Sequence, residues 1–172
     1  METAARTYVL DSNVFIQAKN QYYGFDICPG FWDAVPWYHA HDRLCSIDRV
    51  KDELADGKDE LADWVKSDVA SHCFELTTGA EVIRIYREIM AWVNGPGGFS
   101  RDAIALFAKG ADGWLVAYAK AAGHVVVTHE QLSLGAKKVK IPNVCRQFGV
   151  AWANTFEMIR DLDVQFTWHP PE

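Results

Sequence analysis

The chain has 172 residues, of which 49% are hydrophobic and 23% are charged, and this balance excludes a disordered polypeptide. The length fits one domain over residues 1–172, and the longest apolar run, residues 114–119, is too short to span a bilayer. We therefore expect a cytoplasmic protein with no membrane segment. The net charge of -6 gives no basic footprint for nucleic acid, although dications held by carboxylates would reverse the local field.

The cysteines are scattered along the chain and form no C-x-x-C pair. A zinc ribbon or a disulfide framework is therefore not expected, and the pattern favours buried or partly buried thiols. The four residues are Cys28, Cys45, Cys73 and Cys145.

The first half of the chain alternates between short apolar runs and helical patterns. Such alternation is typical of a parallel sheet covered by helices. In chain order we expect a strand at 7–10, a helix after Asp11-Ser12-Asn13, an aromatic-rich stretch from Tyr22 to Tyr38, an extended segment at 44–46, a helix capped by Ser46 and ended by Gly57, a helical turn at 61–65, and a strand at 74–76.

The second half continues the alternation, and its clearest signal is a helix that leads directly into a β-branched strand. That order indicates a βαβ unit and a parallel sheet. We expect a helix at 81–93 behind a Thr78-x-x-Glu81 capping box, helices at 102–108 and 111–122, a strand at 124–128, extended pieces at 141–143 and 148–152, and a helix capped by Asn154-x-x-Glu157 that runs to Leu162. The tail from Gln165 onward is expected to be loose.

Four acidic residues stand after apolar runs or at helix edges. Asp11 follows the first strand, and Glu130 follows the run from Val125 to Val127. In an open α/β sheet, ligands bind in the crevice beyond the carboxyl ends of the strands. Carboxylates that converge there repel one another unless a divalent cation neutralises them. With Glu53 and Asp112, the pattern predicts a metal-dependent phosphodiesterase, and a small ribonuclease in particular.

The same residues fit the motifs of a known family. The chain resembles PIN-domain nucleases in its order of a strand ending in Asp, a V-x-x-E-L helix, an Asp that opens an alanine-rich helix, and a strand ending in T-x-D. The matching segments are Leu10-Asp11-Ser12-Asn13, Val50-x-x-Glu53-Leu54, Ala111-Asp112 with the following helix, and Thr128-His129-Glu130. The resemblance covers residues 7–152 and is strongest to small prokaryotic proteins related to VapC-like toxin ribonucleases.

The resemblance implies a three-layer α/β/α sandwich around a central, mostly parallel sheet. It implies Mg²⁺ or Mn²⁺ held by Asp11, Glu53 and Asp112, with Glu130 in support, because hard cations prefer oxygen ligands. Asn13 and Thr128 would hydrogen-bond those carboxylates. The implied activity is endonucleolytic hydrolysis of RNA that leaves a 5′-phosphate. The implied partners are an RNA substrate, a cognate antitoxin of a type II toxin-antitoxin pair, and a second copy of the chain.

Two departures from the family pattern bear on this prediction. Glu130 stands where the pattern has Asp, so its longer side chain would reach the metal differently. The aromatic stretch is bulkier than in minimal members, and it would stack RNA bases, receive an antitoxin helix, or serve core and dimer packing. We favour packing, because aromatic residues dominate ordinary buried clusters.

Ordinary structural roles remain open for each acidic residue taken alone. Asp11 could be a turn residue or a helix cap, Asp112 a helix-start carboxylate, and Glu53 a solvated helix residue. The alternative function is a catalytically idle PIN-like binding module that holds a protein or RNA partner through its aromatic surface. His39-x-His41 is interpreted as part of an amphipathic helix in preference to a metal site. The lysines at 137, 138 and 140 would position phosphates or line a solvated loop.

Overall fold

The computed structural model describes residues 5–171 and contains a five-stranded parallel sheet. The strand order is β3-β2-β1-β4-β5, and every pairing is parallel. The strands are β1 (Tyr8–Leu10), β2 (Leu44–Ile47), β3 (Phe74–Glu75), β4 (Val125–Val127) and β5 (Trp152–Ala153). The predicted parallel sheet is therefore confirmed.

Helices follow most of the strands and cover both faces of the sheet. Within the described residues they are α1 (Ser12–Gln17), α2 (Pro29–His39), α3 (Asp48–Ala55), α4 (Glu60–Lys66), α5 (Ala80–Asn94), α6 (Arg101–Lys109), α7 (Asp112–Ala122), α8 (Ile141–Phe148) and α9 (Thr155–Asp161). A π-helical turn at Ala18–Tyr22 extends α1, and a 3-10 turn at Ser71–Cys73 precedes β3.

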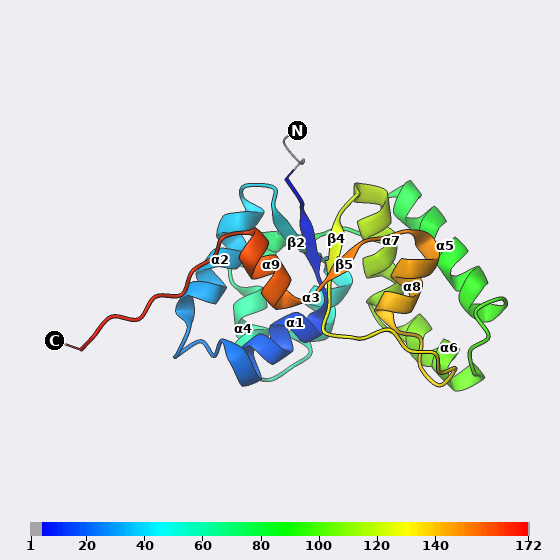
Figure 1. Ribbon diagram of the computed structural model, residues 1–172, viewed down its shortest axis with the longest axis horizontal. Helices are drawn as coiled ribbons and strands as arrows, with labels where there is room; N and C mark the ends of the chain where they lie inside the picture. Colours follow the sequence, from blue (N-terminus) through cyan, green and yellow to red (C-terminus); the bar gives the residue numbers. More distant parts are fainter. Residues whose placement is uncertain (1–4, 172) are drawn as a thin grey trace.

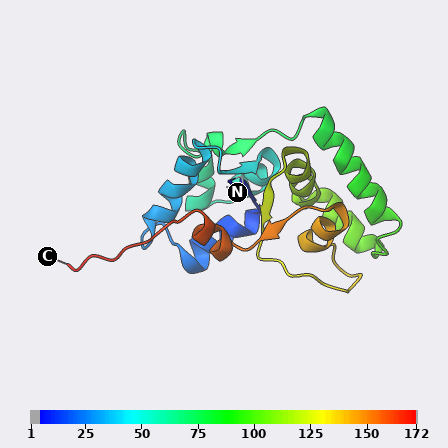
Figure 2. The ribbon, with the colours of Figure 1, turned by 45° about the horizontal axis from the view of Figure 1, so that its top comes forward.

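The layers of this α/β sandwich are visible in two views. In Figures 1 and 2, α1, α2, α4 and α9 lie on one side of the sheet, and α5, α6, α7 and α8 lie on the other. Because both faces are covered, the central strands are apolar along their whole length, and Tyr8, Val9 and Leu10 are at most 1% exposed. The C-terminal tail leaves the fold beside α2.

The chain reverses its direction across the sheet between β1 and β4. From β1 it proceeds to β2 and β3 on one side, and it returns to β4 and β5 on the other side. Val9 pairs with Val126 and Leu10 with Val127, so both strands end at the same level. In open α/β sheets, ligands bind beyond the carboxyl ends of the strands at such a reversal, and we call this end of β1 and β4 the crevice. The residues that follow Leu10 and Val127 are therefore placed at that crevice.

The structure corrects the prediction of an extended segment at 141–143. Ile141–Phe148 forms α8, with Pro142 in its first turn and Gly149 at φ 67° after its last residue. Proline fits the first turn of a helix because its missing N–H has no partner there, and glycine tolerates the left-handed conformation that ends a helix. The Asn154–Glu157 capping box of α9 is present as predicted.

Two predicted helix caps are wrong. The Ser46 hydroxyl donates to the Leu10 carbonyl oxygen at 2.7 Å, and α3 begins after Ile47 instead. Helix α5 begins after Gly79 with no side-chain cap, so Thr78 does not form the expected capping box. Both residues have types that suit caps, but Ser46 lies within β2 and Thr78 stands one residue before Gly79, which holds the cap position of α5.

The aromatic stretch packs mostly into the core, as we favoured. Phe31 and Trp32 are 2% and 3% exposed, and Phe25 stacks on Trp32 with ring centroids 3.9 Å apart. Trp37 does not follow this pattern, because it is 55% exposed and stacks on His41 near the end of α2. Core packing therefore explains most of this stretch, while Tyr22 and Trp37 lie at the surface.

Two further expectations concern the cysteines and the membrane. All four cysteines are free thiols, and each is buried except the partly exposed Cys28. None of the helices in residues 5–171 combines the length and the apolar character needed to cross a bilayer.

Candidate active site

Asp11 is the buried acidic residue of the crevice. It is 1% exposed and follows β1 directly. Its carboxylate accepts hydrogen bonds from the Thr128 hydroxyl at 3.1 Å and the Ser12 hydroxyl at 3.3 Å. Burial raises the pKa of Asp11 to about 6, and the charge of Glu130 adds to this rise, against the opposing effect of the hydrogen bonds. The site therefore holds a carboxylate whose charge is poorly compensated.

Thr128 connects the two strands that border the crevice. Besides its bond to Asp11, its Oγ1 accepts a hydrogen bond from the backbone N–H of Glu130 at 3.2 Å. The side chain therefore fixes the orientation of Asp11 and the path of the chain after β4. The predicted hydrogen bond from Thr128 to an acidic residue is present.

Asp112 and Glu53 meet at the start of α7. Asp112 is the first residue of this helix, and the Glu53 carboxylate accepts the backbone N–H of Ala111 at 2.9 Å. Asp112 is partly buried, and its side chain has no hydrogen-bond partner in residues 5–171. Burial raises its pKa to about 7, and the charges of Asp11, Glu130 and Glu53 raise it further, while Lys138 lowers it.

Glu130 also acts on Asp112 electrostatically, but it is paired with lysine side chains. Its Oε1 is 2.6 Å from the Lys138 ammonium and 3.9 Å from that of Lys140, and its Oε2 accepts the Ile141 backbone N–H at 2.8 Å. The side chain is only 9% exposed. The Lys138 pKa is raised, first by this bond to Glu130 and also by the charges of Asp112 and Asp11.

The four predicted acidic residues influence one another electrostatically at this end of the sheet. Each of the other three carboxylates raises the pKa of Asp112, which requires that they lie near it. No set of three or more His, Cys, Asp or Glu side chains in residues 5–171 is spaced closely enough to enclose a metal ion. Within residues 5–171 the carboxylates therefore lie within electrostatic range of Asp112 but are not grouped at metal-ligating spacing.

Sequence reasoning missed Ser12 and Ser46 and overrated Asn13. The Asn13 side chain is exposed and makes no hydrogen bond to a carboxylate among the described residues, whereas its backbone N–H helps to lower the pKa of Asp11. Ser12 and Ser46 are buried polar residues beside the end of β1. The available signal was a serine within or just after an apolar strand, because a hydroxyl buried there needs a partner.

The two histidines of the His39-x-His41 motif each pair with a backbone carbonyl. The Nδ1 atom of His39 is 3.1 Å from the oxygen of Leu44, and that of His41 is 2.7 Å from the oxygen of Trp37. His39 ends α2, in agreement with the helix interpretation, whereas His41 lies in the turn that follows the helix.

The sequence matches one known protein family. The family described as Domain of unknown function (DUF4411) matches residues 8–166. The chain belongs to this family. A search of the curated proteins found no match. The match of the family covers the strands, the crevice and every acidic residue described above.

A solved structure shares the architecture. A chain in the crystal structure of VapBC2 from Rickettsia felis, bound to a DNA fragment from their promoter, superposes with a TM-score of 0.52 at 14% identity. The alignment covers 86% of the present chain and 98% of the other. At this identity the likeness shows the fold, and together with the parallel sheet it confirms the predicted PIN-like α/β sandwich.

Proposed function

We propose that the chain is a metal-dependent endoribonuclease that hydrolyses RNA phosphodiester bonds. The observation that carries this proposal is the pair Asp11 and Asp112 in the crevice of a PIN-like fold, with pKa values raised to about 6 and about 7. Carboxyl pKa values raised by burial and by neighbouring negative charges cluster at functional sites, where a cation can relieve the repulsion.

Mg²⁺ or Mn²⁺ fits the donor set by its chemistry. Asp11, Glu53 and Asp112 offer carboxylate oxygens, and none of them forms an ion pair in residues 5–171. Hard dications prefer such oxygens and retain waters, so few protein ligands suffice. When bound, the cation supplies positive charge against the negative charge that develops on phosphoryl and leaving oxygens.

The residues of the chain then have separable tasks. Asp11, oriented by Thr128 and Ser12, and the open carboxylate of Asp112 would hold the cation, with Glu53 beside Asp112. Lys138 and Lys140 would contact the phosphates of the substrate, and Glu130, which holds both lysines, would support the cation less directly than Asp11.

We further infer that the nuclease is the toxin of a type II toxin-antitoxin pair. Support comes from the resemblance to VapC-like ribonucleases and from the fold shared with VapBC2. An antitoxin that covers the crevice, and a homodimer, belong to the same proposal. Expression of the wild-type chain alone should arrest bacterial growth, and the Asp112→Asn variant should not. Coexpression of the small protein encoded next to the gene should restore growth.

An idle binding module is the second candidate. It is favoured by the state of Glu130, whose two oxygens are already paired with Lys138 and Ile141. In that case the acidic residues would hold the loop after β4 in place, and RNA or protein binding would occur without hydrolysis.

A circular single-stranded RNA separates these candidates, because only an endonuclease can open it. We expect cleavage with millimolar Mg²⁺ or Mn²⁺, no cleavage in EDTA, and loss of cleavage in Asp112→Asn with an unchanged circular dichroism spectrum. The matched control is Asp102→Asn, which neutralises an exposed acid in the first turn of the neighbouring helix α6. Cleavage that survives EDTA would refute the mechanism, and binding without cleavage would favour the module.

A further inference from the structure

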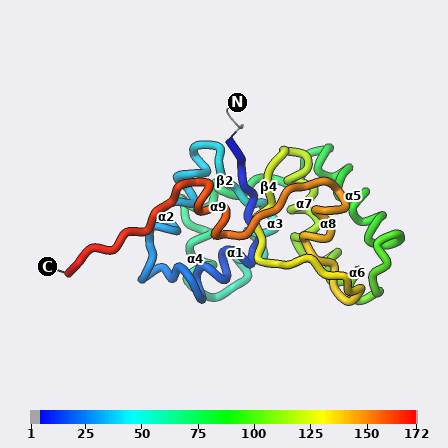
Figure 3. Tube along the Cα trace, viewed as in Figure 1, coloured from blue at the N-terminus to red at the C-terminus, as the bar shows by residue number. Residues whose placement is uncertain are grey.

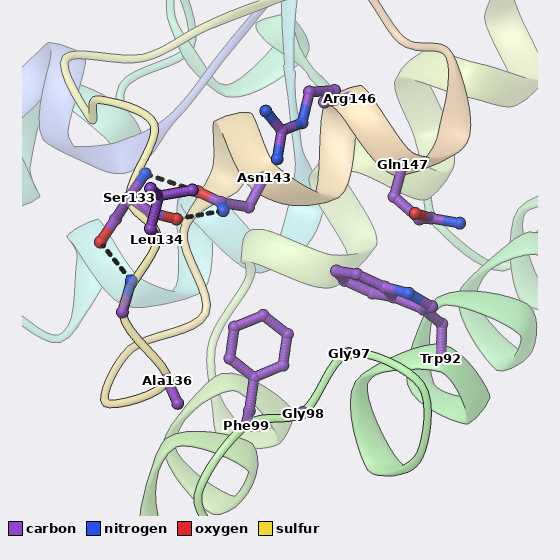
Figure 4. Close-up of a pocket in the computed structure, with 11 residues that line it drawn as sticks. Trp92, Gly97, Gly98, Phe99, Ser133, Leu134, Ala136, Asn143, Arg146 and Gln147 are labelled. Carbon is purple, nitrogen blue, oxygen red and sulfur yellow. Dashed lines mark hydrogen bonds between the residues drawn. The ribbon is translucent and has the colours of Figure 1, made fainter.

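A cavity of about 310 Å³ lies next to the active-site loop. Figure 4 shows the rings of Trp92 and Phe99 on one side of it and α8 residues, with Arg146 and Gln147 among them, on the other. The loop residues 133–136 form its third wall. Ligand pockets in proteins begin at about this volume, so the cavity can accept one flat ring or a single nucleotide.

The aromatic wall has a defined geometry. The centroids of the Trp92 and Phe99 rings are 5.5 Å apart in an edge-to-face arrangement. Gly97 makes this arrangement possible, because a Cβ atom there would lie 2.7 Å from the Phe99 ring and 3.0 Å from the Trp92 carbonyl oxygen. The linker between α5 and α6 is therefore shaped to present these rings to the cavity.

The opposite wall carries polar groups that have no protein partner. Arg146 and Gln147 are exposed, and neither side chain forms a hydrogen bond or an ion pair within residues 5–171. The indole N–H of Trp92 likewise has no acceptor in that part of the chain. Donors and an amide around an aromatic platform are the groups that recognise a heterocyclic base.

The same loop forms the cavity wall and holds the active site. It leaves Glu130 and ends at Ile141, whose N–H returns to the Glu130 carboxylate. Between these points, the Asn143 side chain brackets the backbone of Ser133 through two bonds, at 3.0 and 2.5 Å. The loop also accepts the Ser100 N–H at the Ala136 carbonyl oxygen, 3.1 Å away. Figure 3 shows its course from the end of β4 toward α6.

This region is basic although the protein is acidic. Residues 131–156 contain no Asp or Glu and carry Lys137, Lys138, Lys140 and Arg146, of which Lys138 and Lys140 face Glu130, whereas the whole chain has a net charge of -6. Local positive charge along one loop and helix is the electrostatic footprint expected for a phosphate backbone. The footprint runs from the acidic crevice, at Lys138, to the cavity, at Arg146.

We propose that the cavity binds one base of single-stranded RNA, beside the nucleotide whose phosphate lies at the acidic residues. The base stacks on Trp92, Gln147 meets its polar edge, and Arg146 contacts the adjoining phosphate. This inference rests on the proposed function and deepens it by naming a substrate subsite. Because every base has an aromatic face, the stacking itself discriminates little between sequences.

Binding of a fluorescent octauridylate, measured by anisotropy in Ca²⁺ and in EDTA, tests the subsite without requiring hydrolysis. Replacement of each base in turn by an abasic residue should weaken binding at one position by about fivefold to a hundredfold. Trp92→Leu should weaken the binding of the intact RNA similarly and should abolish the penalty at that position. The control Trp168→Leu removes an indole that is 78% exposed in the tail and should change nothing.

Arg146→Gln provides a second, exposed variant that does not depend on the tolerance of the core to substitution at Trp92. It should reduce the slope of log affinity against log salt by about one, as expected for one lost phosphate contact. Arg87→Gln removes the same charge from an exposed position on α5 outside the cavity and should leave the slope unchanged.

The outcomes separate this inference from the proposed function. RNA that is cleaved while all abasic positions and both cavity variants behave like wild type would overturn the subsite alone. A single sensitive base that depends on Trp92, without any cleavage, would support the subsite and overturn the nuclease. Octauridylate that does not bind at all would overturn the subsite, and cleavage of the circular RNA would then decide the proposed function separately.

Discussion

Two acidic sides of one crevice behave differently. Asp11 and Asp112 are desolvated, unpaired with any cation in residues 5–171, and raised in pKa. Glu130, which follows β4 at the same edge, is paired with Lys138 and with a backbone N–H. One half of the site thus lacks a counterion, and the other half already has one. Acidic residues of one motif can therefore differ in whether a counterion neutralises them. A dication should bind most favourably at the two acids that have none.

The largest expected effect separates these halves by activity. Asp11→Asn should lower the rate of RNA cleavage by about 10²–10³-fold, the usual effect of removing one preorganised electrostatic group. Glu130→Gln should cost no more than about tenfold, because a water molecule can take the place of a supporting ligand. Initial rates on one RNA substrate at saturating Mn²⁺ provide the measurement. Equal losses would show that Glu130 contacts the metal directly.

The pH dependence of stability in EDTA tests the electrostatic basis of the comparison. A carboxyl group whose native pKa lies above its unfolded value of about 3.9 binds more protons in the native state, so the free energy of unfolding falls as pH rises. With Asp11 at about 6 and Asp112 at about 7, urea unfolding should show a gain on the order of 3 kcal/mol from pH 8 to pH 5.

The control for this pH experiment is Asp112→Asn, in which much of the slope should disappear. Asp59 and Glu81, whose pKa values are lowered by Lys19 and Arg84, affect stability only below about pH 4. His124 and His129, whose pKa values are lowered by burial, oppose the gain within the pH window, but they do so equally in wild type and variant and cancel in the comparison. A wild-type protein whose stability is flat between pH 5 and pH 8 would mean that the two acids are well solvated.

Metal should reverse the sign of the Asp112 substitution. In EDTA, Asp112→Asn removes repulsion and should melt at a higher temperature than wild type. In Mn²⁺ at about a hundred times the dissociation constant, wild type should gain about 2.7 kcal/mol, or about 5 to 11 °C, and the variant should lose most of that gain. Differential scanning calorimetry gives both values. A wild-type melting temperature that does not change with millimolar Mn²⁺ or Mg²⁺ would support the binding module.

The smallest expected effect concerns Lys138, the resident cation of the compensated half. Lys138→Met frees the Glu130 carboxylate and removes a repelling charge, so Mn²⁺ should bind about threefold to tenfold more tightly by titration calorimetry. Lys137→Met removes the same charge from an exposed neighbour that has no ion pair among residues 5–171 and should change the affinity little. Identical gains in both variants would assign the effect to net charge alone.

Much of the architecture could be predicted from the sequence. The β-branched run at 125–127, the apolar run at 8–10 and the helical repeat in α5 have periods that local geometry imposes, and each element formed where expected. The segment at 141–148 was mistaken because a short apolar run with a proline fits either a strand end or the first turn of a helix. Gly149, which adopts the left-handed conformation after the last residue of α8, is the helix-ending signal in this segment.

The sequence by itself determined that acidic residues would follow β1 and β4 and would open α7, because the order of elements and the parallel sheet bring those chain positions to one edge. Only the tertiary structure decided how each acid is compensated. Burial removes Asp11, and in part Asp112, from water. The loop after β4 returns at Ile141 and places Lys138 next to Glu130. Charge compensation depends on distance and desolvation between residues far apart in the chain, and no local pattern encodes either quantity.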